Sequence, residues 1–296
     1  MIISAEYDAF LLRTVLAARP YLSELVLVGG CASALYEFHD KSSSGLRPMV
    51  TMDIDIAGDH GLPIPDSVAP LAQLMKNAGF REERFGEGTT PVVKYLHPEA
   101  GEGLDVEFLC PEVSRRGGHR EPSLEIQDGL MAQPLQYLQL LLSDPWRVDL
   151  AKAQLEHLPA DRNLWVQVPN PAAYIMQKIL IHSQREAEAR HKDCYYIYEI
   201  SVTFHEAIES IRAAFEAMKR ICHPGWIRTF HREFLEIFAD ESAEGPRSAV
   251  LIHHASPDHV EEARQRHFVV NEEAVLRSVQ RLFAAFGLPS VPGSSP

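Results

Sequence analysis

Two aspartates stand at alternate positions of an apolar segment, Asp53 and Asp55 in TMDIDI. On a strand, side chains two residues apart project from the same face with their Cα atoms about 6 to 7 Å apart, so both carboxylates can converge on the same ions. Magnesium prefers hard oxygen ligands, and two such ions about 3.5 to 4 Å apart support the transfer of a nucleotidyl group. The aspartate pair is therefore a candidate site for magnesium ions.

A glycine pair, Gly29 and Gly30, precedes the aspartates and follows the apolar run 25–28. Without Cβ atoms, such a turn lets phosphate oxygens approach backbone N–H groups at the start of the next helix, where the helix dipole also favours anions. Ser33 can add a hydroxyl group. Each pair alone is common in proteins, but their combination on successive strands is rarely reached by chance.

The elements that position these residues follow from the spacing of apolar and turn-forming residues. The pattern predicts a mixed α/β first half with these elements: a helix over 6–18, a strand over 25–28, a helix after the glycine pair, a surface loop over 40–48, a strand over 51–59, a helix over 68–78, and a hairpin of strands 91–96 and 104–110.

From Pro134 onward the pattern predicts helices. They begin with LQYLQLLL, resume after VPNP, and continue over 205–239 with a break at His223 and Pro224; a mobile loop over 240–247 and a last helix over 271–287 follow. The expected fold class is α/β, a mixed sheet flanked by helices followed by a mainly helical region. We place a catalytic domain at 1–165, a helical domain that completes the nucleotide site at 166–288, and a disordered tail at 289–296.

The composition restricts the class of partner. The 296-residue chain has 41 acidic and 28 basic residues and a formal net charge of −13, so its surface as a whole repels nucleic acids and anionic lipids. Broad nucleic-acid binding is not expected, although Arg115, Arg116 and Arg120 can form a local basic patch. No stretch reaches the roughly 18 to 20 apolar residues of a membrane span. The four cysteines form no CxxC pair, so we expect a protein of the reducing cytoplasm.

These motifs resemble those of the nucleotidyltransferase-fold superfamily, in which a glycine pair follows the first strand and an aspartate-bearing strand comes next. The matching segments are LVGGCASAL and TMDIDI. The long connection between Gly30 and Asp53 is similar to that of the NTP_transf_8 branch, which is related to AbiEii-type toxins. The resemblance implies a third carboxylate on a later strand, and LDVEFLC offers both Asp105 and Glu107. Since these two share one strand face, both stay candidates.

A helical element after VPNP is also similar to the family, with Lys178, Arg185, Lys192 and Asp193 at its motif positions beside the triphosphate. A compact cation on a long stem, such as Lys178, can reach the β- and γ-phosphates. The alternative for Lys178 is a surface lysine lying along an apolar helix face. For Lys192 and Asp193 the alternative is a solvated helix face or a local ion pair.

The resemblance implies a transferase that moves a nucleoside monophosphate from a nucleoside triphosphate such as ATP to an unidentified acceptor and releases pyrophosphate, with two Mg²⁺ ions. The acceptor can be a small molecule, a protein or an RNA. One alternative is an AbiEii-like toxin with an antitoxin as its partner, acting on RNA or protein. Another is a nucleotide-binding or interaction module without turnover, which the retained carboxylates argue against.

Two further features suggest other chemistries. The histidines His253, His254, His259 and His267 show neither an HxH nor an HExxH spacing, so no transition-metal site is expected. Cys31 follows the glycine pair at the start of a helix, where a thiol can become a nucleophile, but we interpret it as a small residue that packs the turn.

Overall fold

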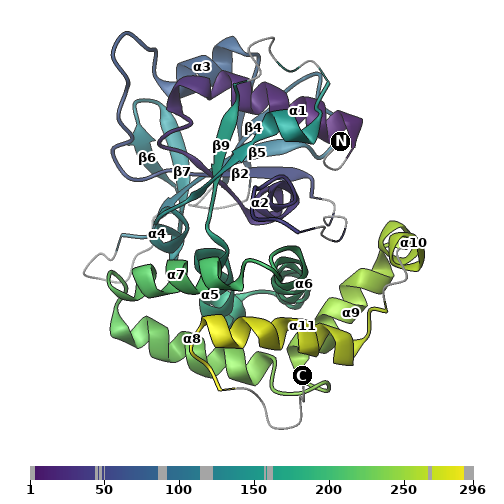
Figure 1. The fold of residues 1–296 in the computed structure, drawn as a ribbon. Helices are drawn as coiled ribbons and strands as arrows, with labels where there is room; N and C mark the ends of the chain where they lie inside the picture. Colours follow the sequence, from purple (N-terminus) through teal and green to yellow (C-terminus); the bar gives the residue numbers. More distant parts are fainter. Residues whose placement is uncertain are drawn as a thin grey trace. The chain divides into compact units, whose positions relative to one another are not determined.

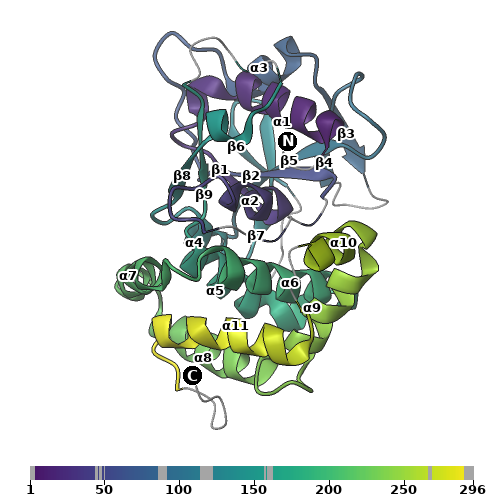
Figure 2. The same ribbon diagram turned by 45° about the vertical axis from the view of Figure 1, so that its right-hand side comes forward.

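The computed structural model describes residues 4–43, 46, 49, 51–85, 92–113, 123–156, 158, 163–265 and 269–289. The chain forms two compact units, the first of residues 1–39 and 49–169 and the second of residues 40–48 and 170–296. Arg115, Arg116, Arg120 and His267 lie outside the described residues, as do residues 290–296 of the expected tail. The helices and β-strands of both units are labelled in Figures 1 and 2.

The first unit is built around a mixed sheet. Its strands are β1 (Val26–Val28), β2 (Asp53–Ala57), β3 (Arg81–Phe85), β4 (Val92–Leu96), β5 (Asp105–Pro111), β6 (Leu124–Gln127) and β7 (Leu130–Leu135). In the order β1-β2-β5-β4-β3, only β2 and β5 run parallel to each other. β7 runs parallel to the end of β5, and β6 pairs with β7. A separate two-stranded sheet consists of β8 (Trp146–Asp149) and β9 (Trp165–Val168).

The helices of the first unit are short. They are α1 (Ala5–Ala17), α2 (Gly29–Tyr36), α3 (Leu71–Asn77) and α4 (Leu138–Leu141), with 3-10 turns η1 (Arg19–Tyr21) and η2 (Leu150–Ala153). α1 begins where the Ser4 hydroxyl accepts a hydrogen bond from the Tyr7 N–H at 3.1 Å, which satisfies one donor of the first turn. Figures 1 and 2 show α1 beside α3 and α2 beside β2.

Apolar and acidic residues alternate along β2, so they project from opposite faces of the sheet. Ile54 and Ile56 are buried, with 0% and 3% of their surface exposed. Asp53 and Asp55, at the intervening positions, are half-buried. The strand therefore directs its apolar residues into the core and both carboxylates to the other side.

The regular secondary structure among the described residues of the second unit consists of helices joined by turns and loops. Its helices are α5 (Pro171–Ile181), α6 (Ala187–Thr203), α7 (Ile208–Lys219), α8 (Pro224–Ile237), α9 (Glu244–Ala255), α10 (Pro257–Gln265) and α11 (Glu272–Ala285), with the 3-10 turn η3 (His182–Gln184). α6 packs against α9 and α11, and α5 packs against α7 and α8. α5 begins with Pro171, and the Asn170 side chain accepts a hydrogen bond from the Ala173 N–H at 2.9 Å. No helix among the described residues is long and apolar enough to span a membrane.

The structure confirms the expected fold class, a mixed sheet flanked by helices and followed by a mainly helical region. The predicted onset of helices at Pro134 is wrong. β7 continues to Leu135, α4 has only four residues, and the pair β8 and β9 follows. The continuous helical region starts after Pro169, so the end of the first unit lies beyond the expected boundary at residue 165, which would cut β9.

The predicted loop over 240–247 in the second unit is too long, because α9 already begins at Glu244. His253 and His254 lie in this helix. The expected surface loop over 40–48 is grouped with the second unit, where the Ser43 N–H donates a hydrogen bond to the Thr203 carbonyl at 2.9 Å.

Candidate active site

The turn between β1 and α2 brings a glycine against a carboxylate. Gly29 has a φ of +62°, in the left-handed region that glycine adopts without strain. A Cβ atom at Gly29 would overlap the Asp55 carboxylate. Val28 and Asp55 are direct partners in the antiparallel pair of β1 and β2, which fixes this approach. The start of α2 and the aspartate strand therefore meet at one place.

Four carboxylates share one face of the sheet where β2 and β5 run side by side. Asp53 is the register partner of Asp105, and Asp55 is the register partner of Glu107. Because paired residues of neighbouring strands project from the same face, all four side chains lie on the face opposite Ile54. The structure thus brings together the predicted pair on β2 and both candidates for the third carboxylate on β5.

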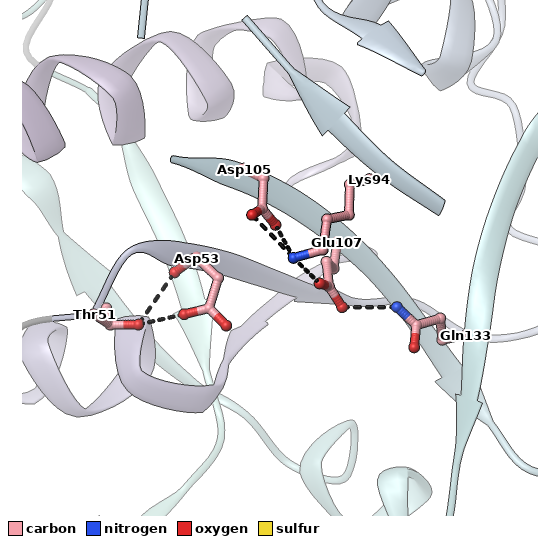
Figure 3. Close-up of polar contacts among 6 residues, drawn as sticks. All are labelled: Thr51, Asp53, Lys94, Asp105, Glu107 and Gln133. Carbon is pink, nitrogen blue, oxygen red and sulfur yellow. Dashed lines mark hydrogen bonds and ion pairs between the residues drawn. The ribbon is translucent and has the colours of Figure 1, made fainter. Parts of the chain in front are cut away.

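Lys94 of β4 lies among the carboxylates of β5. It is the register partner of Glu107. Its Nζ lies 2.7 Å from Glu107 Oε1, and 3.1 Å and 3.0 Å from Asp105 Oδ1 and Oδ2 (Figure 3). Burial lowers the pKa of Lys94, but the hydrogen bonds to Glu107 and Asp105 and the charges of both outweigh it, so the pKa of Lys94 is raised.

Two neutral side chains add polar contacts to the carboxylates. The Thr51 hydroxyl donates a short hydrogen bond to Asp53 Oδ1, and the Gln133 amide on β7 donates to Glu107 Oε2 at 2.7 Å (Figure 3). Glu107 is therefore held through both oxygens, one by Lys94 and the other by Gln133. Hydrogen bonds of this kind orient carboxylates that act on another group.

The carboxylates also act electrostatically on one another and on Cys31. Burial raises the pKa of Asp105, hydrogen bonds and the charge of Lys94 oppose this shift, and the charges of Glu107 and Asp53 add to it. Burial, with the charges of Asp55 and Asp53, raises the pKa of the Cys31 thiol to about 12. A buried thiol with such a pKa is not a nucleophile near neutral pH, which agrees with Cys31 as a packing residue.

The donor chemistry of this face suits a hard divalent cation. Its ligand atoms are carboxylate oxygens on two adjacent strands, the type that Mg²⁺ prefers. As the side chains stand, no group of three or more acidic, histidine or cysteine residues within the described part of the chain is arranged to hold a metal ion. The β5 carboxylates instead hold the Lys94 ammonium group. The residues that fit a metal ion are therefore Asp53 and Asp55, with Asp105 and Glu107 beside them.

A second group of charged residues lies inside the helical unit. Asp193 of α6 has 1% of its surface exposed. Its carboxylate oxygens lie 2.8 Å from Lys178 Nζ and 3.1 Å from Arg185 Nε. Both contacts are ion pairs by distance, and neither has the geometry of a hydrogen bond. Lys178 is buried and lies over the rings of Tyr174 and Tyr196, at 5.4 and 5.7 Å from their centroids, so it is not a surface lysine.

Lys192 does not join this group. It is exposed and forms an ion pair with Glu188 one helical turn away, at 2.7 Å. The interpretation of a solvated ion pair therefore applies to Lys192, whereas Asp193, its neighbour in sequence, is buried. Gly29, Gly30, Ser33 and the four carboxylates belong to the first unit, and Lys178, Arg185 and Asp193 belong to the second.

Sequence reasoning missed Thr51, Lys94 and Gln133. Thr51 and Gln133 carry no signal in the sequence that separates them from other polar residues. Lys94 is the one polar residue in the strand-like run VVKYL, and a charged residue inside an apolar strand needs a partner. This charge indicates that Lys94 has an acidic partner, but it does not by itself identify the carboxylates of LDVEFLC as that partner.

Comparison with known proteins adds one finding. The family model NTP_transf_8, described as Nucleotidyltransferase, matches residues 10–219, more than half of the chain. The matched range includes all candidate site residues, from Gly29 to Asp193. No curated protein and no solved structure matches the chain.

Proposed function

Because the chain belongs to the NTP_transf_8 nucleotidyltransferase family, we propose that it uses Mg²⁺ to transfer a nucleoside monophosphate from a nucleoside triphosphate to an acceptor. An acceptor oxygen attacks the α-phosphorus, a new oxygen–phosphorus bond forms, and the bond to the leaving pyrophosphate breaks. The observation that supports this most strongly is the meeting of Gly29 with Asp55, which puts a helix N-terminus next to paired carboxylates.

The first unit supplies the groups for the triphosphate and the metal. Backbone N–H groups of Gly29 and Gly30 bind phosphate oxygens at the start of α2, and Ser33, one turn further, adds its hydroxyl. Asp53 and Asp55 hold the metal ion. When bound, Mg²⁺ neutralises charge on the triphosphate and polarises the α-phosphate. Thr51 keeps the Asp53 carboxylate oriented.

The β5 carboxylates act on the acceptor side of the site. Asp105 stands opposite Asp53, and Glu107 stands opposite Asp55. Either can orient an acceptor hydroxyl or accept its proton. Burial raises the pKa of Asp105, which increases the affinity of this carboxylate for a proton.

The charged group of the helical unit, Lys178, Arg185 and Asp193, lies within the range that the family model matches. Lys178 and Arg185 share Asp193, and the more exposed of the two, Arg185, has a side chain that is 36% exposed. We propose that Arg185 contacts phosphate oxygens while Asp193 and Lys178 hold its position. Lys192, which is exposed and paired with Glu188, contributes little.

The acceptor is a small molecule, a protein or an RNA. The net charge of −13 argues against broad nucleic-acid binding and favours the first two. A toxin that modifies RNA or protein uses the same chemistry, and growth arrest on expression, relieved by an adjacent antitoxin gene, would identify that role.

Release of pyrophosphate from each nucleoside triphosphate, measured with Mg²⁺ and candidate acceptors, tests the proposal. We expect release that needs Mg²⁺ and falls by about 10³-fold or more in Asp53→Asn, because that variant removes a metal ligand. A folded Asp53→Asn protein with undiminished release would contradict the assigned site. Tight nucleotide binding without pyrophosphate release under any condition would identify a module that has lost turnover.

A further inference from the structure

The Lys94 ammonium group lies between the two carboxylates of β5, Asp105 and Glu107. Its Nζ contacts both oxygens of Asp105, at 3.1 and 3.0 Å, and Glu107 Oε1 at 2.7 Å. Three short contacts use the three N–H donors of one ammonium group. Lys94 thus forms the same kind of bridge between two carboxylates that a metal ion forms in a two-metal site.

The strand positions Lys94 firmly. Lys94 stands in the middle of β4 as the register partner of Glu107, and its neighbours Val93 and Tyr95 are buried on the opposite face. Its ammonium group also lies over the Phe85 ring, 5.9 Å from the centroid. The Lys94 side chain is 26% exposed, so the contacts are partly shielded from water. Strand geometry therefore directs the ammonium group at the β5 carboxylates.

Each oxygen of the two β5 carboxylates has a polar contact. Glu107 uses Oε1 for Lys94 and Oε2 for Gln133. Asp105 uses both oxygens for Lys94. A metal ion bound to either residue would face the positive charge of Lys94 at close range, and the low local dielectric strengthens that repulsion. Among the residues that the structure describes, no such cation contacts Asp53, whose carboxylate accepts a hydrogen bond from the neutral Thr51 hydroxyl.

We infer that the Lys94 ammonium group serves as a fixed cation of this site, so that the protein binds one divalent metal ion, through Asp53 and Asp55, in place of the two expected from sequence. The inference rests on the proposed metal-dependent function. Lys94 is a positioning residue in this role: it neutralises Asp105 and Glu107 and holds them in place without contacting the metal ion.

Counting bound Mn²⁺ tests this directly, since Mn²⁺ replaces Mg²⁺ at oxygen sites and its free form is quantified by electron paramagnetic resonance. The wild-type protein is expected to bind one Mn²⁺ per chain, and Asp53→Asn none. Lys94→Met, which keeps an unbranched side chain one atom shorter and removes the charge, is expected to bind a second Mn²⁺ at Asp105 and Glu107. Lys76→Met, which removes an exposed lysine of α3, is the matched control and should bind one.

The outcomes separate the inference from the proposed function. Two Mn²⁺ ions in the wild-type protein, or one in a Lys94→Met protein with a native circular dichroism spectrum, would overturn the role of Lys94 and leave the transferase proposal standing. No bound Mn²⁺ in the wild-type protein would overturn both. If Lys94→Met does not fold, Asp105→Asn and Glu107→Gln decide: retention of one Mn²⁺ in both variants supports the inference, and its loss in either overturns it.

Discussion

Gly29 combines two constraints that only glycine meets. Its φ of +62° disfavours any side chain, and the space that a Cβ atom would need is taken by the Asp55 carboxylate. Gly29 therefore joins the turn that we propose binds phosphate to the strand that we propose holds the metal ion. A side chain at position 29 would have to displace the Asp55 carboxylate, so it would change the glycine turn and the aspartate strand together.

Gly29→Ala is expected to lower nucleotide transfer by about 10²-fold, because displacement of a reacting group by roughly 1 Å has an effect of that size. Gly61→Ala is the matched control, since Gly61 has a φ of +68° and its Cβ would meet nothing within 4 Å. Both substitutions should cost about 1 kcal/mol of unfolding free energy from backbone strain, measured by urea denaturation. Equal activity in the two variants would show that the approach of Gly29 to Asp55 is unimportant.

The sequence predicts which carboxylates share a strand face, and it predicts part of the contact between Lys94 and these carboxylates. Alternation alone indicates that Asp53 and Asp55 share a face, and it does the same for Asp105 and Glu107. Their mutual register, Asp53 with Asp105, depends on a parallel pairing between strands distant in the chain. The pairing of Lys94 with Glu107 is easier to predict from the sequence. A hairpin whose loop spans residues 97–104 places these two residues opposite each other, and the structure shows the same pairing.

At the scale of elements, Asp193 joins α5 to α6 by electrostatic contacts. It is almost fully buried between Lys178 of α5 and Arg185, which precedes α6. A buried carboxylate with two cationic neighbours is costly to remove, because the lysine then remains buried without compensation. This group therefore stabilises the helical unit whether or not a nucleotide is bound.

Asp193→Asn is expected to lower the unfolding free energy by about 3 kcal/mol, since it breaks a buried ion pair and leaves a charge behind. Lys192→Met, at the neighbouring position, removes only an exposed ion pair with Glu188 and should change stability by less than about 0.5 kcal/mol. Urea denaturation of both variants measures the difference. A loss of nucleotide affinity in Asp193→Asn with unchanged stability would instead assign Asp193 to the ligand.

The packing of α9, α10 and α6 carries a dependence on pH. His253 is buried; its ring stacks on His259, with the centroids 5.9 Å apart, and lies near Tyr195. Burial, with the positive charges that His259 and His254 can carry, lowers the pKa of His253 to about 4. As the pH falls, His253 of the unfolded chain is therefore protonated near its usual pKa of about 6.5. In the folded protein it is protonated only at a lower pH.

The stability that depends on neutral His253 is complete above pH 6.5 and is lost as the pH falls toward 4. We expect the unfolding free energy to decrease by up to about 1.4 kcal/mol per pH unit in this window, and by about 3 kcal/mol across it. Urea denaturation between pH 7.5 and pH 4.5 measures the slope. His253→Gln should flatten it, and His254→Gln, at an exposed position, should not; the same slope in both variants would count against His253.

Elements with a clear apolar period were predictable, and those without one were not. α1, α2, α7, α8 and α11 agree with the sequence pattern. β3 was missed because its five residues, REERF, are all exposed and show no alternation. β7 contains Pro134, which normally argues against a strand; here Pro134 pairs with Cys110 near the end of β5. The tertiary pairing, which the local sequence does not encode, decides the structure there.

At the scale of the whole molecule, the chain divides its site residues between two units. The unit with the mixed sheet carries the glycines and the carboxylates, and the helical unit carries Lys178, Arg185 and Asp193. The family model spans both, since it extends from residue 10 to residue 219. Residues beyond 219 add α8 to α11, which pack on α5 and α6.

The most direct test of nucleotidyl transfer follows the two ends of the triphosphate separately. Nucleoside triphosphates labelled at the α- or the γ-phosphate are incubated with the protein, Mg²⁺ and a cell extract, and label is then measured in the small-molecule, protein and RNA fractions. We predict that the α-label enters one fraction and that the γ-label leaves as pyrophosphate. Asp53→Asn and Asp55→Asn should each abolish the transfer of the α-label and the release of labelled pyrophosphate. Transfer of the γ-label in place of the α-label, or α-label transfer that survives both substitutions, would contradict this prediction.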